Sequence, residues 1–389
     1  MPDNLASPGV LLSTAHDKLS HLITTDLTRR GVRVEGIGPQ CPAVLRLAGQ
    51  LTQFHRAPPL DDTARFVDRV CDVMSKRRLD VFLPSCREVN RLAPFQPRLA
   101  QEANYPFPDE RITKAVSNKA ELADLAERHG IAAPPTLPVS SDILDRAAEL
   151  CFPLICKPKR SCNSRGLRVV SSPEALRSYL AGKTDDYLVQ EYIDGSLIVW
   201  NGVYSNGALH SVFAFEAVRT SPAQCGVSVL RKAIHIPALD AIAIRLLSAL
   251  GYEGFCSLDF MRDRRKGQYF LIDFNPRFPS SLHASLHAGI SFPWILLNLV
   301  LGRQCPGCDY ADGVVTMSLS GHIGRILRRR PGGPRFAALL GDTLTALRWL
   351  HQSEESYLLR PFPFAGPIFC AVAGFWTQAK RLGGQILEF

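Results

Sequence analysis

The chain has 389 residues, of which 46% are hydrophobic and 21% charged, and its formal net charge is +9. This composition excludes intrinsic disorder as the main state of the chain, and the length excludes a small domain that depends on disulfide bonds. At roughly 100–200 residues per domain we expect two or three domains, and the positive charge favours anionic partners such as nucleotides, carboxylates, nucleic acid or a membrane surface.

The first third of the chain alternates short apolar runs with amphipathic segments. The expected elements are strands at 9–12, 32–37 and 79–83 and helices at 16–29 and 66–76. Such alternation is typical of a parallel α/β sheet of Rossmann-like type. The turn after the first strand, residues 13–17, contains no glycine, which argues against a dinucleotide site there.

Longer strands joined by hairpins follow the break at Pro134 and Pro135. A helix is expected from Lys119 to His129, with Asn118 as its N-terminal cap and Gly130 as its end. The other expected elements are strands at 152–157, 167–170, 187–193, 197–204, 208–217, 254–261 and 268–275, and helices that begin at 173, 238, 282 and 294. The pattern therefore predicts an α+β region after the α/β region.

The periodicity weakens after Gly302, where we expect a small C-terminal subdomain. A basic run at 325–330 and an apolar segment at 361–376 lie in this part, and the three prolines of the apolar segment argue against a membrane span. The expected domain boundaries are 1–112 for the first α/β domain, 113–304 for the central domain and 305–389 for the C-terminal subdomain.

The 11 cysteines have no regular spacing, and no secretory signal opens the chain. We therefore expect reduced thiols and a cytoplasmic protein. Cys305 and Cys308 have the spacing of metal ligands, but no second pair lies near them in the sequence, so a zinc site is not expected.

The second predicted hairpin carries the strongest candidate site. Because residues i and i+2 of a strand share a face, Asp273 and Asn275 point the same way, and Asp259 on the partner strand alternates with apolar neighbours in the same manner. Two carboxylates and a carboxamide on one face suit Mg²⁺. Arg277 lies two residues after Asn275, where it could neutralise a transferring phosphoryl group. The alternative is a pair of solvated acids on an edge hairpin, which the apolar neighbours disfavour.

A polar and basic loop of small residues runs from Lys157 to Gly166. Its backbone amides and the hydroxyls of Ser161 and Ser164 suit a phosphate group, and Lys157 adds a positive charge. Lys119, at the start of a helix, is a further candidate for contact with phosphate. The alternative is a solvated hairpin loop with ordinary surface lysines.

Taken in order, these segments resemble the ATP-grasp superfamily over about residues 119–302. That family shows a lysine at a helix start, a strand lysine that leads into a loop of small residues, a hinge strand that receives adenine, an acid, and an acid-x-Asn-x-Arg motif. The matching residues here are Lys119, Lys157, Ser161, Ser164, Gly166, Gln190, Glu191, Tyr192, Ile193, Asp259, Asp273, Asn275 and Arg277. The chain looks closest to the carbamoyl-phosphate-synthase-like and amino-acid-ligase branches.

Three positions depart from the family pattern. Asp273 stands where the second metal-binding acid is usually Glu, and Leu197 stands where an acid often binds the ribose hydroxyls. The loop before Gly166 is also poor in glycine. These departures concern metal geometry, ribose contact and loop movement respectively.

The resemblance implies an ATP-grasp fold preceded by the Rossmann-like domain, with a lid at about 119–190 and a nucleotide- and metal-binding half at about 191–304. It implies an enzyme that uses ATP and Mg²⁺ (or Mn²⁺) to convert a carboxylate to an acyl phosphate. An amine then displaces phosphate, so the products are an amide, ADP and phosphate. The candidates for binding the substrate carboxylate are Arg219, Arg231 and Lys232.

Two alternatives stay open for the function. One is the bicarbonate or carbamate chemistry of related branches, and the other is a nucleotide-binding module that docks on a membrane or a partner protein through 325–330 and 361–376. Nucleic-acid binding is not expected, because the basic residues are not interleaved with aromatic ones. The expected partners are a small-molecule carboxylate and amine, and a homodimer also stays open.

Overall fold

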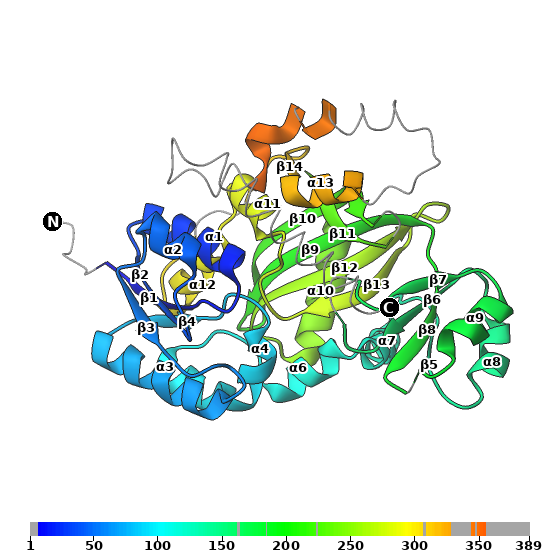
Figure 1. The fold of residues 1–389 in the computed structure, drawn as a ribbon, viewed down its shortest axis with the longest axis horizontal. Coiled ribbons are helices and arrows are strands. Elements are labelled where there is room, and N and C mark those ends of the chain that lie inside the picture. The colour runs from blue at the N-terminus through cyan, green and yellow to red at the C-terminus, as the bar shows by residue number, and fades with distance from the viewer. Residues whose placement is uncertain are drawn as a thin grey trace.

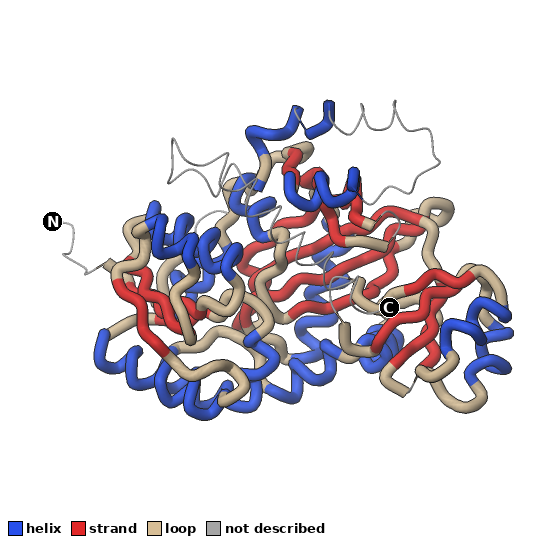
Figure 2. The backbone as a smooth tube through the Cα atoms, in the orientation of Figure 1, coloured by secondary structure: helices blue, strands red, loops and turns tan. Residues whose placement is uncertain are grey.

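The computed structural model describes residues 7–161, 164–183, 185–222, 225–305, 309–327, 344–346 and 348–354. The described strands form three sheets, one parallel and two antiparallel. Figure 1 and Figure 2 show these sheets one after another across the molecule, with helices packed on them. The predicted combination of α/β and α+β architecture is confirmed.

The first sheet is parallel and has the strand order β3-β2-β1-β4. Its elements are β1 (Gly9–Ser13), α1 (Asp17–Arg29), β2 (Arg33–Gly38), α2 (Ala43–Ala48), β3 (Gln53–Arg56), α3 (Thr63–Arg77) and β4 (Val81–Leu83). The three predicted strands and both predicted helices are present. The sequence pattern missed α2 and β3, because β3 is a short edge strand of mostly polar residues that is defined by its pairing with β2.

A series of short helices leads from the first sheet to the second. These helices are α4 (Glu88–Leu92), η1 (Ala93–Phe95), α5 (Gln96–Ala103), α6 (Glu110–Ser117) and α7 (Lys119–Arg128). The Asn118 side chain accepts a hydrogen bond from the Ala120 N–H at 3.1 Å, and Gly130 has a φ of 64°. The predicted cap and the predicted glycine after the helix are thus confirmed. The cap makes Lys119 the first residue of α7.

The second sheet is antiparallel, has the order β5-β8-β6-β7, and packs against helices on one side (Figure 1). Its elements are β5 (Thr136–Pro138), α8 (Ile143–Arg146), η2 (Ala147–Glu149), β6 (Leu154–Pro158), β7 (Arg168–Val170), α9 (Pro173–Leu180) and β8 (Tyr187–Glu191). Leu154, Val189 and Leu176 belong to its buried core. Because that core is distinct from the cores beside the central sheet, the second sheet is a packing unit of its own.

The third, central sheet is antiparallel and has the order β13-β12-β9-β10-β11-β14. Its elements are β9 (Gly195–Ser205), β10 (Ala208–Ser221), β11 (Val227–Ala233), α10 (Pro237–Leu250), β12 (Gly254–Asp263), β13 (Tyr269–Asn275), α11 (Leu282–His287), α12 (Phe292–Val300) and β14 (Val315–Met317). Ile198 and Trp200 pack in one core with α6, α7 and α10, whereas Val199 and Val203 pack in another with α12 and the first sheet. The first and central sheets therefore share a continuous core.

The described part of the chain after residue 304 adds to the central sheet. Strand β14 pairs with β11, and α13 (Leu319–Leu327) packs on β10 and β11, with η3 (Leu350–Gln352) beside β14. The division of the chain at residue 304 stays a prediction. Residues 328–330 and 361–376, which were predicted to contact a membrane or a partner, lie outside the described residues. Within the described ranges, no helix is long and apolar enough to cross a bilayer.

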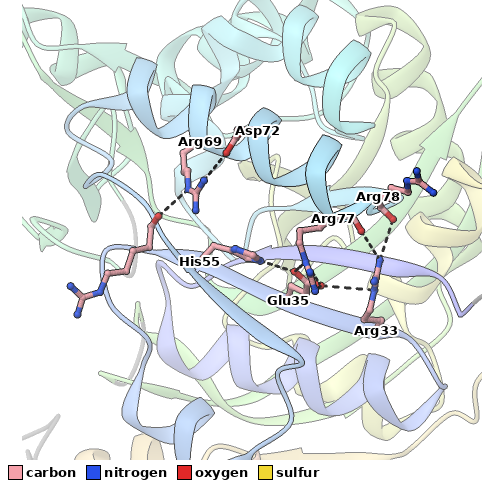
Figure 3. A network of polar contacts seen from close by, with 8 residues as sticks. Arg33, Glu35, His55, Arg69, Asp72, Arg77 and Arg78 are labelled. Atoms are coloured by element: carbon pink, nitrogen blue, oxygen red, sulfur yellow. Dashed lines mark hydrogen bonds and ion pairs between the residues drawn. The ribbon is translucent and has the colours of Figure 1, made fainter.

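Glu35 is a fully buried carboxylate in the first sheet that joins three elements (Figure 3). Its oxygens accept hydrogen bonds from Arg77 at 3.0–3.2 Å, and one lies 2.6 Å from Nε2 of His55. Burial by itself would raise the pKa of Glu35, but the bonds from Arg77 and His55 outweigh burial and lower it. The anionic form of Glu35 thus links β2 and β3 to the end of α3.

We expect Glu35→Gln to lower the free energy of unfolding by about 2 kcal/mol at pH 7, because the charge-assisted hydrogen bonds are lost. A depressed carboxylate pKa contributes stability above the unfolded-state value, and this stability disappears as pH falls through the folded-state value. The difference between wild type and variant should therefore shrink below about pH 4.

Urea unfolding at several pH values measures this difference. The matched control is Glu102→Gln, which removes an exposed glutamate that pairs with Arg98 at 2.8 Å and should leave the transition unchanged. Equal unfolding midpoints for Glu35→Gln and Glu102→Gln at pH 7 would contradict the role assigned to Glu35.

Candidate active site

A cavity of about 630 Å³ opens where the three sheets meet. Its lining includes Lys157 and Gln190 from the second sheet, Asp259 and Asp273 from the central sheet, and Arg87 from the loop after β4. The structure thus gathers residues from all three parts of the chain around one space.

Asp259 and Asp273 are directly opposite each other in the β12–β13 hairpin. Asn275 lies two residues further along β13 and is paired with Ser257, so the three oxygen-bearing side chains share one face. The apolar neighbours Leu258 and Phe274 are buried on the other face. The convergence expected from the alternation is present.

Two negative charges placed side by side require compensation, and cations from other elements provide it. Burial, and then the adjacent Asp273 carboxylate, raise the pKa of Asp259, whereas Lys119, Arg277 and Lys157 act in the opposite direction. Lys119 Nζ forms an ion pair with Asp273 Oδ1 at 2.9 Å, which connects the start of α7 to this hairpin. The carboxylate pair therefore sits in a ring of cations.

The same oxygen atoms fit a divalent cation. Carboxylate and carboxamide oxygens are hard ligands, and a bound cation would relieve the burial and the repulsion from Asp273 that raise the pKa of Asp259. Within the described residues, no group of three or more His, Cys, Asp and Glu side chains is placed to hold a metal. The candidate set here has only two carboxylates, with Asn275 as the third oxygen donor, which suits an ion that keeps several waters or phosphate oxygens.

Lys157 is buried and directed at the side chain of Gln190. Its Nζ donates a hydrogen bond to Gln190 Oε1 at 2.9 Å, and Gln190 Nε2 donates to Thr136 Oγ1 at 2.7 Å. Burial, and then the Lys119 ammonium, lower the pKa of Lys157 to about 8. Lys157 is therefore held in position, and a nearby anion would stabilise its ammonium form.

Ser161 and Ser164, from the predicted phosphate loop, line the cavity. Lys119 Nζ donates to the Ser161 carbonyl at 3.0 Å, and the Ser164 hydroxyl donates to the carbonyl of Cys225 in the β10–β11 connection. Gly166 has a φ of 68°, and a Cβ there would lie 2.9 Å from Pro158 Cγ. The loop is thus joined to the central sheet and needs glycine at its end.

The hinge residues Glu191, Tyr192 and Ile193 form part of the cavity wall, as does Leu197 at the start of β9. The N–H of Glu191 donates to the Pro135 carbonyl at 3.0 Å, and that of Tyr192 donates to the Pro153 carbonyl at 3.3 Å. These two amides are already engaged within the protein, which makes Ile193 the best-placed amide donor of the three.

The predicted cationic residues differ in their positions. Arg277 lines the cavity, and its Nη2 donates to Asn275 Oδ1 at 2.9 Å. Arg219 also lines it. Arg231 is buried outside the lining, with bonds to the Ser228 hydroxyl at 3.0 Å and the Ser228 carbonyl at 2.9 Å, and Lys232 is exposed on β11. Arg219 is therefore the member of this group that the structure brings to the cavity.

The sequence interpretation missed the contribution of the first sheet. His16, Cys86 and Arg87 line the cavity, and Arg277 Nη1 lies 3.8 Å from Cys86 Sγ. His16 follows β1 and the other two follow β4, at the carboxyl ends of parallel strands. That position is where open α/β sheets bind ligands, and it is the signal that would have found them.

Comparison with known proteins agrees with this geometry. Residues 116–281 match the family model of the ATP-grasp domain. Among curated relatives, the formate-dependent phosphoribosylglycinamide formyltransferase of Ignicoccus hospitalis is 31% identical over 139 residues, or 33% of this chain and 34% of the relative. The D-alanine–D-alanine ligase of Ectopseudomonas mendocina is 28% identical over 212 residues, or 49% of this chain and 64% of the relative. The chain thus spans about a third of the length of the formyltransferase and just under two thirds of the length of the D-alanine–D-alanine ligase.

Solved structures share the fold over most of the chain. The N5-carboxyaminoimidazole synthetase of Staphylococcus aureus, complexed with ADP, has a TM-score of 0.64 at 15% identity, covering 80% of this chain and 82% of that one. The L-amino acid ligase of Bacillus licheniformis has a TM-score of 0.59 at 17% identity, covering 76% and 74%. At these identities the likeness establishes the ATP-grasp fold.

Proposed function

We propose that the protein is an ATP-dependent ligase that joins a carboxylate to an amine. The observation that carries the proposal is the opposed pair Asp259 and Asp273, with Asn275 beside it, facing a cavity that also contains Lys119 and Arg277. This arrangement combines a metal-binding oxygen set with cations for phosphate. The family, whose curated relatives here include a D-alanine–D-alanine ligase, supports the proposal.

Asp259, Asp273 and Asn275 would hold Mg²⁺ or Mn²⁺. A bound divalent cation neutralises phosphate charge and orients the transferring group. Binding of the cation would also relieve the repulsion between the two carboxylates, which is the cause of part of the raised Asp259 pKa.

Lys119 and Lys157 would bind phosphate oxygens of ATP from one side of the cavity. The loop from Ser161 to Gly166 would cover the phosphates and exclude water, since Ser164 already joins it to Cys225. Adenine would lie against the hinge, with the Ile193 N–H as donor and a hinge carbonyl as acceptor. Gln190 would hold Lys157 in position.

The reaction proceeds in two steps in this proposal. A carboxylate oxygen of the first substrate attacks the γ-phosphorus, the bond to the ADP oxygen breaks, and an acyl phosphate forms. The amine nitrogen then attacks the acyl carbon, phosphate leaves, and the nitrogen loses a proton to give an amide. Arg277 stabilises the charge on the phosphoryl group, and Arg219 is the candidate for binding the substrate carboxylate.

We expect the purified protein with Mg²⁺, ATP and pairs drawn from a panel of carboxylates and amines to release ADP and phosphate. Asp273→Ala should reduce that release by about 100-fold or more, because the developing charge loses its stabilisation. The matched control is Asp124→Ala, an exposed acid on α7 outside the cavity lining, which should keep full activity.

Coupled assays for ADP and for AMP distinguish the outcomes. Formation of AMP and pyrophosphate would contradict an acyl-phosphate intermediate, and full activity of Asp273→Ala would contradict the metal site. ADP release that requires bicarbonate alone would favour the carboxyphosphate alternative over the ligase.

The affinity for ATP should fall as pH rises through about 8, the value to which burial lowers the pKa of Lys157. The ammonium form attracts phosphate and predominates below that pH, whereas the neutral form predominates above it. Once the pH exceeds the pKa, the dissociation constant should rise by up to about tenfold per pH unit.

Isothermal titration with ATP and Mg²⁺ between pH 7 and 9.5 measures this effect. Lys157→Arg keeps a permanent charge and should remove the dependence, because a guanidinium stays protonated throughout the range. Lys159→Arg, in the same loop but outside the cavity lining, should retain it. A dependence that persists unchanged in Lys157→Arg would rule out Lys157 as its source.

A further inference from the structure

The carboxyl ends of β1 and β4 form a crevice that opens into the active-site cavity. From β1 the chain passes through α1 to β2 and then to β3, and α3 returns it to β4 on the opposite side of β1. The order β3-β2-β1-β4 therefore reverses between β1 and β4, which makes this edge a topological switch point. In open α/β sheets such points leave the crevice in which ligands bind.

A buried carboxylate forms hydrogen bonds to both strand ends of this crevice. Glu88 is 3% exposed, and its Oε1 accepts hydrogen bonds from the Ser13 hydroxyl, the Ser85 hydroxyl at 2.9 Å and the Ser85 N–H at 2.5 Å. Ser85 Oγ in turn accepts a hydrogen bond from the His16 N–H at 3.2 Å. One carboxylate thus connects the loop after β1 to the loop after β4.

Burying a carboxylate between two loops carries a desolvation cost. Among the described residues, no lysine or arginine forms an ion pair with Glu88, so its charge is compensated mainly by the serine donors. An apolar contact would pack the loops at lower cost but would leave their relative positions less closely defined. The bonds of Glu88 instead fix the positions from which His16 and Arg87 face the cavity.

The rim of the crevice presents hydrogen-bond donors. His16 Nδ1 accepts a bond from the Leu19 N–H at 3.3 Å, so the neutral ring carries its proton on Nε2. Burial, and then Lys18, lower the pKa of His16 and favour that neutral form. Arg87 is exposed, lines the cavity, and forms no ion pair with the described residues. The rim thus offers one N–H and one guanidinium to a ligand.

The crevice also lies next to the proposed reaction centre. Cys86, between Ser85 and Arg87, is 3.8 Å from Nη1 of Arg277, and Nη2 of Arg277 bonds Asn275 of the metal-binding set. A molecule held by Arg87 and His16 would therefore approach the phosphoryl group from the side of the first sheet.

We propose that this crevice binds an anionic group of the second substrate, an amine that carries its own carboxylate or phosphate. Arg87 and His16 bind the anion, and Glu88 is a positioning residue that sets the spacing of their loops. The inference rests on the proposed ligase function and adds the chemical class of the amine. It assigns to the first sheet a substrate-selecting role.

The test measures binding rather than turnover. The protein is first saturated with Mg²⁺ and a non-hydrolysable ATP analogue, which fills the phosphate sites, and is then titrated with glycine, O-phosphoethanolamine or propylamine, which carries no anionic group. Wild type should bind at least one anionic amine and should bind propylamine at least tenfold more weakly. Preference for glycine identifies a carboxylate as the anion, and preference for O-phosphoethanolamine identifies a phosphate.

Arg87→Gln should weaken binding of the preferred anionic amine by about tenfold or more, because a charge-assisted bond is lost, while affinity for the ATP analogue stays within twofold. Arg65→Gln is the matched control, since Arg65 lies on α3 with a side chain that is 78% exposed and outside the cavity lining. Equal affinities for Arg87→Gln and Arg65→Gln, or equal binding of propylamine and both anionic amines, would overturn the proposal.

Glu88→Leu tests the positioning role and Glu88→Gln its rescue. Glu88→Leu should weaken binding of the anionic amine by about tenfold and leave the affinity for the ATP analogue unchanged. Glu88→Gln, which keeps an acceptor oxygen, should recover most of the affinity for the amine. If Glu88→Leu does not fold, Ser13→Ala removes one of the same hydrogen bonds. It should weaken binding of the amine and leave binding of the ATP analogue unchanged. Loss of both ligands in parallel would show a merely structural role. Failure of wild type to bind the ATP analogue would instead refute the proposed function.

Discussion

The direct opposition of Asp259 and Asp273 in the β12–β13 hairpin is the constraint on which the site depends. Burial, together with repulsion from the Asp273 carboxylate on the neighbouring strand, raises the pKa of Asp259. The structure tolerates the two carboxylates because Lys119, Lys157 and Arg277 surround them. These cations come from a helix start, from the second sheet and from the segment after β13, so the balance of charge requires all three to assemble.

Hydrophobic packing fixes this electrostatic arrangement. Leu258, Phe260 and Phe274 are buried with α10 on the opposite face of the same two strands. A register shift of one residue would bring those apolar side chains to the cavity and move the carboxylates into the core. The core therefore holds the charges together in a position that they would not adopt by themselves.

The sequence predicted the features that depend on local periodicity. Alternation in β12 and β13 placed Asp259 and Asp273 on one face, and the cap at Asn118 located the start of α7. Contacts between distant segments have no such local signal, as with Lys119 and Asp273 or the hydroxyl of Ser164 and the carbonyl of Cys225. The wall formed by the first sheet was missed for the same reason, because it depends on how two sheets pack.

That packing places the first sheet beside the candidate site. Helix α12 contacts α1 and β4 on one side and β9 and β12 on the other, within one continuous apolar core. The carboxyl ends of β1 and β4 are thereby held against the segment that follows β13, where Arg277 lies between Cys86 and Asn275. A crevice of a parallel sheet and the polar face of an antiparallel one thus meet at a single arginine. Because a rigid core joins the two sheets, a substrate bound at the first would be aligned with a phosphoryl group at the second without movement of either sheet.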